Sequence, residues 1–160
     1  MANTIEKFLP LSAEFPTSNY PALLQDGQAR HYLAFDDTTD ETCYWTSVAN
    51  QSLTGTLNAI IKYRGVATSG TFLPVCAIEA ITAGDAVDTD STSSFDTDNT
   101  PSAVTVPATA GYEEEVTVTL TSKDSIAAGD YYRLRLFRDV SGDNHFGDIH
   151  VFSVELRDSV

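Results

Sequence analysis

The sequence predicts an all-β protein: a single jelly-roll-like antiparallel β-sandwich with an extended N-terminal arm. Three observations support this fold class. Short runs rich in β-branched and aromatic residues begin at residue 31, and Gly, Asp, Asn, Ser and Thr fill the gaps between them. Apolar and polar residues alternate along the later runs, as in strands with one buried face. No convincing amphipathic helix interrupts the series, and eight such strands are typical of a two-sheet sandwich.

Residues 1–30 differ from the rest of the chain and form the predicted arm. Pro10, Pro16 and Pro21 keep this segment extended and prevent a helix interior. The segment also has more large apolar side chains than a solvated tail would carry. These side chains are Phe8, Leu9, Leu11, Phe15, Tyr20, Leu23 and Leu24. We therefore expect the arm to lie on a surface, which is either its own domain or a neighbouring subunit.

The sandwich domain is expected over residues 31–160. Its strands are predicted at 31–35, 42–48, 56–64, 72–81, 102–107, 115–122, 131–139 and 148–157. The two-residue period is clearest in two of the later strands. Valine and leucine alternate with threonine in 115–122, and tyrosine and leucine alternate with arginine in 131–139. These strands are expected to bury one face and expose the other.

The segment RDVSGDNHFGDIHVFSVELRD, residues 138–158, allows two interpretations. Its Asp, Asn and Ser residues resemble a calcium loop, or they form the polar turn of a long hairpin. An EF-hand loop that begins at Asp139 does not fit, because Asn144 stands where Gly is needed and His150 where Glu is needed. A turn at 139–147 instead places the large apolar side chains of both flanking strands on the core face, with Leu136 opposite His150 and Leu134 opposite Phe152. The sequence therefore predicts a hairpin.

This hairpin register, which pairs Arg138 with Asp148, turns a second set of side chains away from the core. They are Tyr131, Arg133, Arg135 and Phe137. One interpretation is a solvated face on which Arg133 pairs with Glu155, an exposed ion pair of little energetic value. The other is a contact surface, because interleaved arginine and aromatic residues are favoured at the centres of interfaces.

Charge limits the classes of partner. The chain has 160 residues, with 23 acidic and 9 basic side chains and a formal net charge of −14. Nucleic acid is not an expected partner, because its binding relies on Lys and Arg to neutralise phosphates. A membrane is not expected either, because no apolar run approaches the roughly 20 residues that cross a bilayer. Cys43 and Cys76 lie in strand-like runs, so we expect buried free thiols, with a disulfide as the alternative.

No catalytic motif is evident, so we expect no enzyme activity, no cofactor and no metal site. The histidines His31, His145 and His150 are scattered and are expected to be core or turn residues rather than ligands. The segment AGDAVDTDSTSSFDTDNTPS, residues 83–102, is rich in aspartate and has no strand pattern. It is either a solvated loop or an oxygen-rich calcium site, and Phe95 within it indicates that the loop is pinned to the body.

Four stretches together resemble a known family. They are YLAFDDTTDETCYW (32–45), GDAVDTDSTSSFDTDNT (84–100), AAGDYYRLRLFRD (127–139) and GDIHVFSVELRD (147–158). In their residue composition and their order along the chain, they are similar to small β-sandwich structural proteins of tailed bacteriophages. The resemblance covers most of 31–158 and leaves out the arm. It implies a virion component, either a capsid decoration (cement) protein or a head-, neck- or tail-attached module, with a jelly-roll-like fold and no enzymatic activity.

The function expected from this resemblance is that of a capsid decoration (cement) protein, which binds the outer capsid surface and stabilises contacts between capsid subunits. The expected partners are the major capsid protein or other virion subunits and further copies of the chain, and the expected location is the virion, after synthesis in the host cytoplasm. The expected interface residues are Phe8, Leu9, Leu11, Phe15, Tyr20, Leu23, Tyr131, Arg133, Arg135 and Phe137.

The alternative function is a carbohydrate- or receptor-binding module associated with a tail or fibre. The aromatic residues considered as its stacking platform are Trp45, Tyr44, Tyr63 and Tyr112. The competing interpretation of these residues is core packing.

Overall fold

Strands form all the long elements of the fold. The computed structural model describes residues 2–51, 53 and 55–159. Its elements are β1 (Ala2–Phe8), the 3-10 turn η1 (Pro10–Ser12), β2 (Ala22–Gln25), β3 (His31–Phe35), β4 (Thr42–Val48), β5 (Thr56–Gly65), β6 (Thr71–Phe72), β7 (Pro74–Ile81), β8 (Val104–Thr105), β9 (Glu114–Leu120), β10 (Tyr131–Arg138) and β11 (Ile149–Ser159). Each of the strands expected from the sequence has a counterpart. No helix in the described part of the chain is long and apolar enough to cross a membrane.

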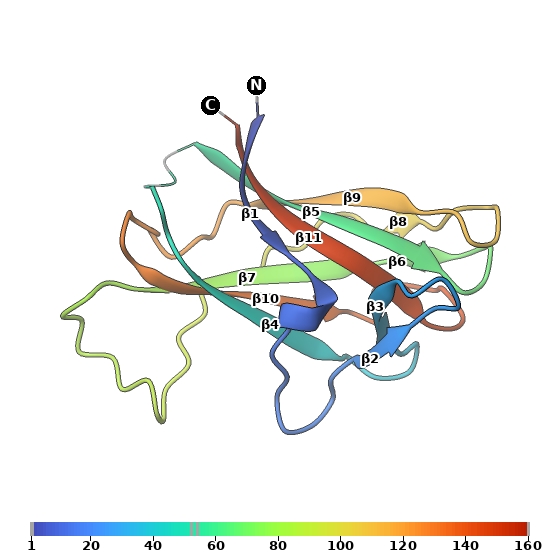
Figure 1. The fold of residues 1–160 in the computed structure, drawn as a ribbon, viewed down its shortest axis with the longest axis horizontal. Coiled ribbons are helices and arrows are strands. Elements are labelled where there is room, and N and C mark those ends of the chain that lie inside the picture. Colours follow the sequence, from blue (N-terminus) through green and yellow to red (C-terminus); the bar gives the residue numbers. More distant parts are fainter. Residues whose placement is uncertain (1, 52, 54, 160) are drawn as a thin grey trace.

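Two antiparallel sheets face each other across one hydrophobic core (Figure 1). The larger sheet has the strand order β2-β3-β11-β5-β9, and β1 also pairs with β11. The smaller sheet has the order β4-β10-β7, and β6 and β8 form a short separate ladder. Trp45, Tyr63 and Tyr132 are among the largest fully buried side chains. The predicted jelly-roll-like antiparallel sandwich is thus confirmed, and Trp45 and Tyr63 belong to its core.

Alternation along the strands sets which side chains enter the core. β9 buries Val116, Val118 and Leu120 and exposes the residues between them. β10 buries Tyr132, Leu134 and Leu136 in the same way. This is the period-two pattern expected for strands that face a core on one side.

The two cysteines are buried free thiols, as the sequence predicts. Cys43 of β4 and Cys76 of β7 pair with Leu136 of β10 from opposite sides. They are therefore two strand spacings apart, about 10 Å, which exceeds the Cα separation that a disulfide allows. Burial raises the pKa of the Cys76 thiol to about 12, so this group stays protonated at neutral pH.

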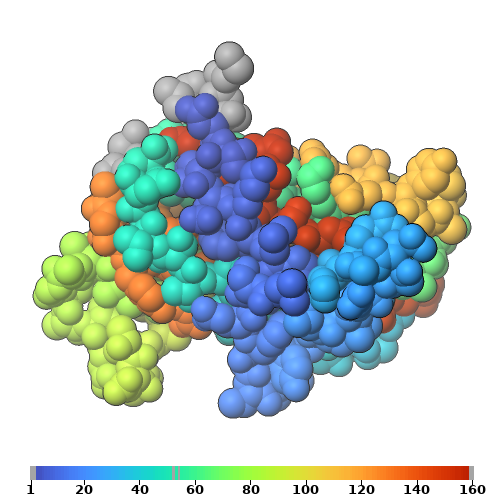
Figure 2. All heavy atoms as spheres, viewed as in Figure 1, coloured from blue at the N-terminus to red at the C-terminus, as the bar shows by residue number. Residues whose placement is uncertain are grey.

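The first part of the N-terminal segment lies on its own domain. β1 pairs with β11 along the larger sheet, and Glu14 then bridges to Tyr44 at the edge of the smaller sheet. Phe8 is buried in the core with its ring 5.8 Å from that of Trp45, and the Trp45 indole donates a hydrogen bond of 3.0 Å to the Leu9 carbonyl. In the space-filling view this segment covers the middle of one face of the molecule (Figure 2). Residues 2–14 therefore join the two sheets.

The predicted hairpin of 131–139 and 148–157 is wrong, because the two strands belong to different sheets. β10 lies between β4 and β7, whereas β11 pairs with β1, β3 and β5. Arg133 accordingly pairs with Glu79 of β7, and the expected partner Glu155 contacts Arg157 and Lys7 instead. Alternation specifies which face of a strand is buried, and it leaves the neighbouring strand unspecified.

The connection between β10 and β11 is organised by a buried arginine. Arg138 is fully buried, and its Nε and Nη2 donate to the two carboxylate oxygens of Asp143 at 2.7 and 3.1 Å. The same guanidinium donates to the carbonyls of Phe35, Asp36, His145 and Gly147. Because these carbonyls lie at the end of β3 or just before β11, Arg138 ties the end of the smaller sheet to the larger sheet. Asp143 thus binds an arginine in the segment that resembles a calcium loop.

Replacing Phe8 by alanine tests whether the N-terminal segment is part of the core. We expect Phe8→Ala to lower the free energy of unfolding by about 3–5 kcal/mol, because it leaves a cavity beside Trp45 and Tyr132. Leu11→Ala, at a side chain that is 66% exposed, should change it by less than about 0.5 kcal/mol. Urea denaturation measures both values. Equal, small effects would mean that the segment is not docked as described.

Replacing Arg138 by leucine should be strongly destabilising. The change leaves the buried carboxylate of Asp143 and several carbonyls without their donor, at a cost of about 3–5 kcal/mol in the free energy of unfolding. The double variant Arg138→Leu/Asp143→Leu should recover part of that loss, because it no longer buries an unpaired charge. Denaturant midpoints of the two variants and the parent measure the difference. A double variant no more stable than the single one would contradict the charge argument.

Candidate binding groove

A groove opens on the outer face of the larger sheet where β11 changes its neighbour. On one side β11 pairs with β5 along its whole length. On the other side it pairs with β3 at Ile149–Val151 and with β1 from Val154 onward. Between these two ladders the register of β11 against β5 shifts, and Phe152 is the extra residue of that bulge. Bulges re-aim side chains, and here the bulge places Phe152 on the outer face.

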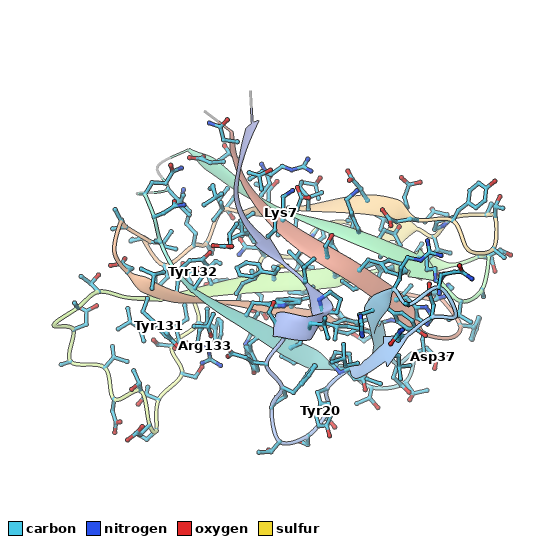
Figure 3. All side chains as sticks on the ribbon, in the orientation of Figure 1. Lys7, Tyr20, Asp37, Tyr131, Tyr132 and Arg133 are labelled. Carbon is cyan, nitrogen blue, oxygen red and sulfur yellow. The ribbon has the colours of Figure 1, made fainter. Side chains whose placement is uncertain are left out.

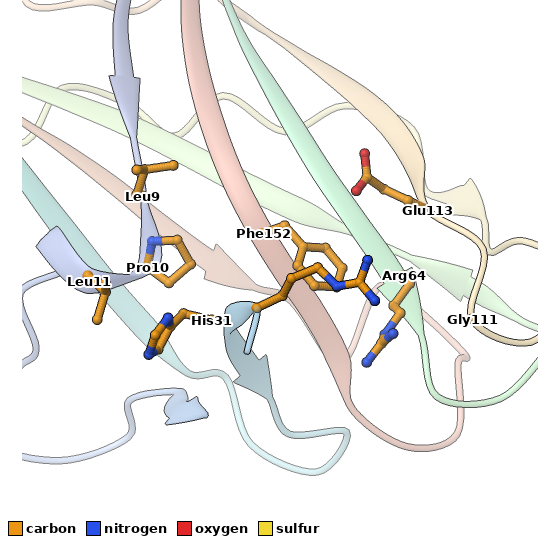
Figure 4. Close-up of a pocket in the computed structure, with 9 residues that line it drawn as sticks. Leu9, Pro10, Leu11, His31, Arg64, Gly111, Glu113 and Phe152 are labelled. Carbon is orange, nitrogen blue, oxygen red and sulfur yellow. The ribbon is translucent and has the colours of Figure 1, made fainter. Parts of the chain in front are cut away.

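The groove has a volume of about 420 Å³. Figure 4 shows Leu9 and the η1 residues Pro10 and Leu11 on one side and Arg64, Gly111 and Glu113 on the other, with Phe152 between them. Arg30 and His31 complete its lining. It therefore combines an apolar wall, one aromatic ring and a few charged groups, which is the usual composition of a small-ligand site.

Arg64, at the end of β5, is held by an aromatic cluster. Its guanidinium carbon lies 5.3 Å from the ring centroid of Phe152 and 5.7 Å from that of Tyr32. Its Nε donates a hydrogen bond of 3.2 Å to Nδ1 of His150, and the His150 ring stacks on Tyr32 with centroids 4.1 Å apart. These contacts hold the guanidinium in place and leave its two Nη groups without a hydrogen bond to the described residues.

The electrostatics of this cluster keep His150 neutral. Burial, together with the charge of Arg64, lowers the pKa of His150 to about 4. A neutral imidazole can accept the Arg64 hydrogen bond at Nδ1, whereas an imidazolium would repel the guanidinium. His150 therefore acts as a fixed acceptor that orients Arg64 across the neutral pH range.

The other charged groups of the groove are paired within the protein. Arg30 lies 3.1 Å from a carboxylate oxygen of Asp26. Glu113 lies 3.5 Å from Nζ of Lys62, which also contacts Glu115. Their contribution to stability is small because these pairs are exposed, but they set the charge at the mouth of the groove.

The structure separates the predicted interface residues of the N-terminal segment. Leu9 and Leu11 line the groove, and Phe8 is buried in the core. Phe15 and Tyr20 contact each other at 5.5 Å on a different part of the surface. Leu23 is exposed on β2. Phe8 is therefore not available to a partner, whereas the other five side chains are at the surface.

The four predicted interface residues of β10 do lie together, on the outer face of the smaller sheet. Arg133 lies over the Tyr44 and Phe95 rings, and Arg135 lies over the Phe95 and Phe137 rings. Tyr131 is the exposed member of the group. Figure 3 shows Tyr131 and Arg133 beside the start of the loop after β7, far from Tyr20. Phe95 comes from that loop, so the protein covers much of this face with its own chain.

One part of the aspartate-rich segment 83–102 is hydrogen-bonded to β7, and another part projects from the sandwich as a loop (Figure 1). Asp96 and Asn99 form backbone hydrogen bonds with Ile78 and Cys76 of β7, and the Ser94 amide donates to the buried Glu79 carboxylate. The expected anchoring role of Phe95 agrees with its contacts. No group of three or more His, Cys, Asp or Glu side chains that could hold a metal ion occurs among the residues the structure describes.

Most of the groove lining could not be predicted from the sequence. Arg30 precedes β3, Arg64 lies at the end of β5, and Gly111 and Glu113 lie in the connection before β9, and nothing in the spacing of these three segments brings them together. Phe152 was assigned to the core face. One signal was available: the apolar residues Val151, Val154 and Leu156 are spaced by three and then two, and this break in the period indicates a bulge between the valines.

Solved structures of other proteins share this fold. A family 35 carbohydrate-binding module from an environmental isolate matches with a TM-score of 0.56 and 11% identity, over 94% of this chain and 91% of that chain. The C-terminal CBM6 of LamC, a marine laminarinase from Zobellia galactanivorans, matches with 0.50 and 14%, over 96% and 98%. An arabinose-bound α-L-arabinofuranosidase, MgGH51, matches with 0.53 and 11%, over 96% of this chain and 26% of that chain. At these identities the likeness shows the fold alone.

Neither protein-family models nor curated protein sequences give a match to the chain. The expected function as a capsid decoration protein is wrong: the proteins that share the fold include carbohydrate-binding modules, and the segment meant to contact a neighbouring capsid subunit lies on its own domain. The resemblance to phage structural proteins, the virion location, the capsid partners and the homo-oligomer stay untested predictions.

The depressed pKa of His150 predicts a pH dependence of stability. Between pH 6.5 and 4 the unfolded chain binds a proton at this position and the folded protein does not, so the folded state loses stability as the pH falls through this window. In His150→Gln this contribution is absent. We therefore expect the parent protein to lose more free energy of unfolding than the variant between pH 7 and 4, as measured by urea denaturation at a series of pH values. Parallel pH profiles would contradict a neutral His150.

Proposed function

We propose that the protein is a carbohydrate-binding domain and that the groove on the larger sheet is its glycan site. The observation that carries this proposal is the combination of Phe152 and Arg64 in an open groove lined otherwise by apolar and polar groups. A sugar ring presents C–H groups on its faces and hydroxyl groups around its edge. The groove offers a counterpart to each.

The aromatic part of the site suits the faces of a sugar ring. The π-face of an aromatic ring is electron-rich, so it attracts the weakly positive C–H groups of a pyranose while both surfaces lose water. Phe152 is half-buried and is held at the bulge of β11, with its ring centroid 6.0 Å from that of Tyr32. A ring fixed by packing in this way loses little conformational entropy when a ligand binds.

The polar part of the site suits the sugar hydroxyl groups. The guanidinium groups of Arg30 and Arg64 are donors, and the carboxylate of Glu113 is an acceptor. A small number of polar groups at fixed positions within a mostly apolar pocket is what orients a ligand. The arrangement therefore favours recognition of a polyol ring over recognition of a purely apolar ligand.

The fold and the absence of a catalytic arrangement in the described groove agree with binding without turnover. Two of the proteins that share the fold are carbohydrate-binding modules by name. In the groove, Glu113 is the only carboxylate among the lining residues, and a glycoside hydrolase commonly needs a pair. We therefore propose a non-catalytic domain.

Affinity electrophoresis in gels that contain soluble polysaccharides tests the proposal. Xylan, mixed-linkage β-glucan, galactomannan, polygalacturonate and dextran sulfate serve as probes, and retardation is quantified for each. We expect at least one of them to retard the protein, and Phe152→Ala to weaken that binding about tenfold, because one ring-stacking contact is worth about 1.4 kcal/mol.

Phe137→Ala is the matched control. Phe137 is also a half-buried phenylalanine beneath an arginine, but it lies on the outer face of the smaller sheet. This variant should bind as tightly as the parent. A lack of retardation by any polysaccharide, or equal losses in the two variants, would overturn the proposed site.

A further inference from the structure

We infer that the groove selects an acidic sugar, whose carboxylate or sulfate group binds the guanidinium of Arg64. This inference rests on the proposed function and names the class of glycan. It follows from the charge pairing of the chain, from the fixed geometry of Arg64 and from the groups that face it.

Charge pairing sets Arg64 apart from the other arginines. Each of the other five has a carboxylate within ion-pair distance: Arg30 with Asp26, Arg133 with Glu79, Arg135 with Asp98, Arg138 with Asp143 and Arg157 with Glu155. Arg64 has none in the described part of the chain, although the protein has 23 acidic residues and 9 basic ones. With so many carboxylates available, an arginine without one is the position where an anion from outside can bind.

The geometry of Arg64 prepares it for a planar or tetrahedral anion. Its Nε donates to His150, and its guanidinium carbon lies over the Tyr32 and Phe152 rings. The two Nη groups form the free edge of the fork, and they are the donors that bind carboxylate or sulfate oxygens in pairs. Because the protein already holds the guanidinium plane, binding an anion there costs little side-chain entropy.

The surrounding groups favour an anion locally. The groove lining has two guanidinium groups and one carboxylate, and Lys62 lies 3.5 Å from that carboxylate, Glu113. His31 is the remaining titratable group of the lining and adds no negative charge. The net charge of −14 acts over longer distances and is screened beyond about 8–10 Å at physiological salt. Direct hydrogen bonds to Arg64 therefore outweigh the repulsion from the rest of the surface.

Phe152 and Arg64 fix the relative position of ring and acid. The guanidinium carbon of Arg64 lies 5.3 Å from the Phe152 centroid. A sugar bound in the groove beside Phe152 is therefore next to this guanidinium, and an acidic substituent on the sugar can accept hydrogen bonds from the Nη groups. A neutral sugar could occupy the same place, but the Nη groups of Arg64 would then bind water or an uncharged hydroxyl group. The difference in affinity between the acidic and the neutral sugar therefore comes from the charge-assisted hydrogen bonds.

Matched pairs of charged and neutral probes test the inference. Titration calorimetry at 50 mM salt compares polygalacturonate with its fully methyl-esterified form, and dextran sulfate with dextran. We expect the charged member of one pair to bind at least about tenfold more tightly, and the pair that shows the difference distinguishes carboxylate from sulfate as the ligand. Arg64→Gln should remove this preference.

Arg157→Gln is the control for general electrostatics, because it removes the same charge from β11 of the same sheet at a residue paired with Glu155. It should keep the preference for the charged probe. Thermal melts check that both variants are folded.

If neutral and charged probes bind equally well to the parent, the inference is overturned and the proposed function stands. If no polysaccharide of either kind binds, both are overturned. If Arg157→Gln reduces the preference as much as Arg64→Gln does, the binding is non-specific and the inference fails.

Discussion

The structure depends on the need of β11 for hydrogen-bonding partners on both sides. This strand is the longest of the fold and lies in the middle of the larger sheet, where an unpaired backbone edge would be costly. β5 satisfies one side completely, but β3 covers only the first residues of the other side. The N-terminal strand β1 supplies the rest. Between Val151, the last residue paired with β3, and Val154, the first paired with β1, β11 has no regular ladder on this side. The bulge at Phe152 and the groove lie in this interval.

Charge has a different role in each part of the molecule. At the end of β10, Arg138 is buried and paired with Asp143. The connection that resembles a calcium loop thus surrounds an arginine. On the outer face of the smaller sheet, Arg133 and Arg135 are covered by aromatic rings and paired with Glu79 and Asp98. Only at the groove is a guanidinium of the described residues left without a carboxylate. In the part of the chain that the structure describes, five of the six arginines therefore pair with carboxylates of the chain, and Arg64 does not.

The sequence contained enough information for the fold class but not for the site. Alternation in 115–122 and 131–139 identified the strands and their buried faces, because this pattern is local. Which strands are neighbours is decided by packing between distant segments, so the expected hairpin was wrong even though both of its strands exist. His150 and Phe152 were placed on the core face because a regular period was extended through a bulge. The lining of the groove comes from five separate parts of the chain, and no spacing rule joins them.

The size of the groove limits how it can achieve specificity. At about 420 Å³ it lies toward the small end of ligand sites and accommodates about one or two sugar rings. A long platform can add many weak stacking contacts along a polysaccharide, but a short groove has few contacts to add. Selectivity must then come from strong interactions at fixed positions, and the strongest donor available is the guanidinium of Arg64, which His150, Tyr32 and Phe152 hold in place. The bulge of β11 thus places Phe152 in the groove, and Phe152 in turn helps to hold the guanidinium of Arg64.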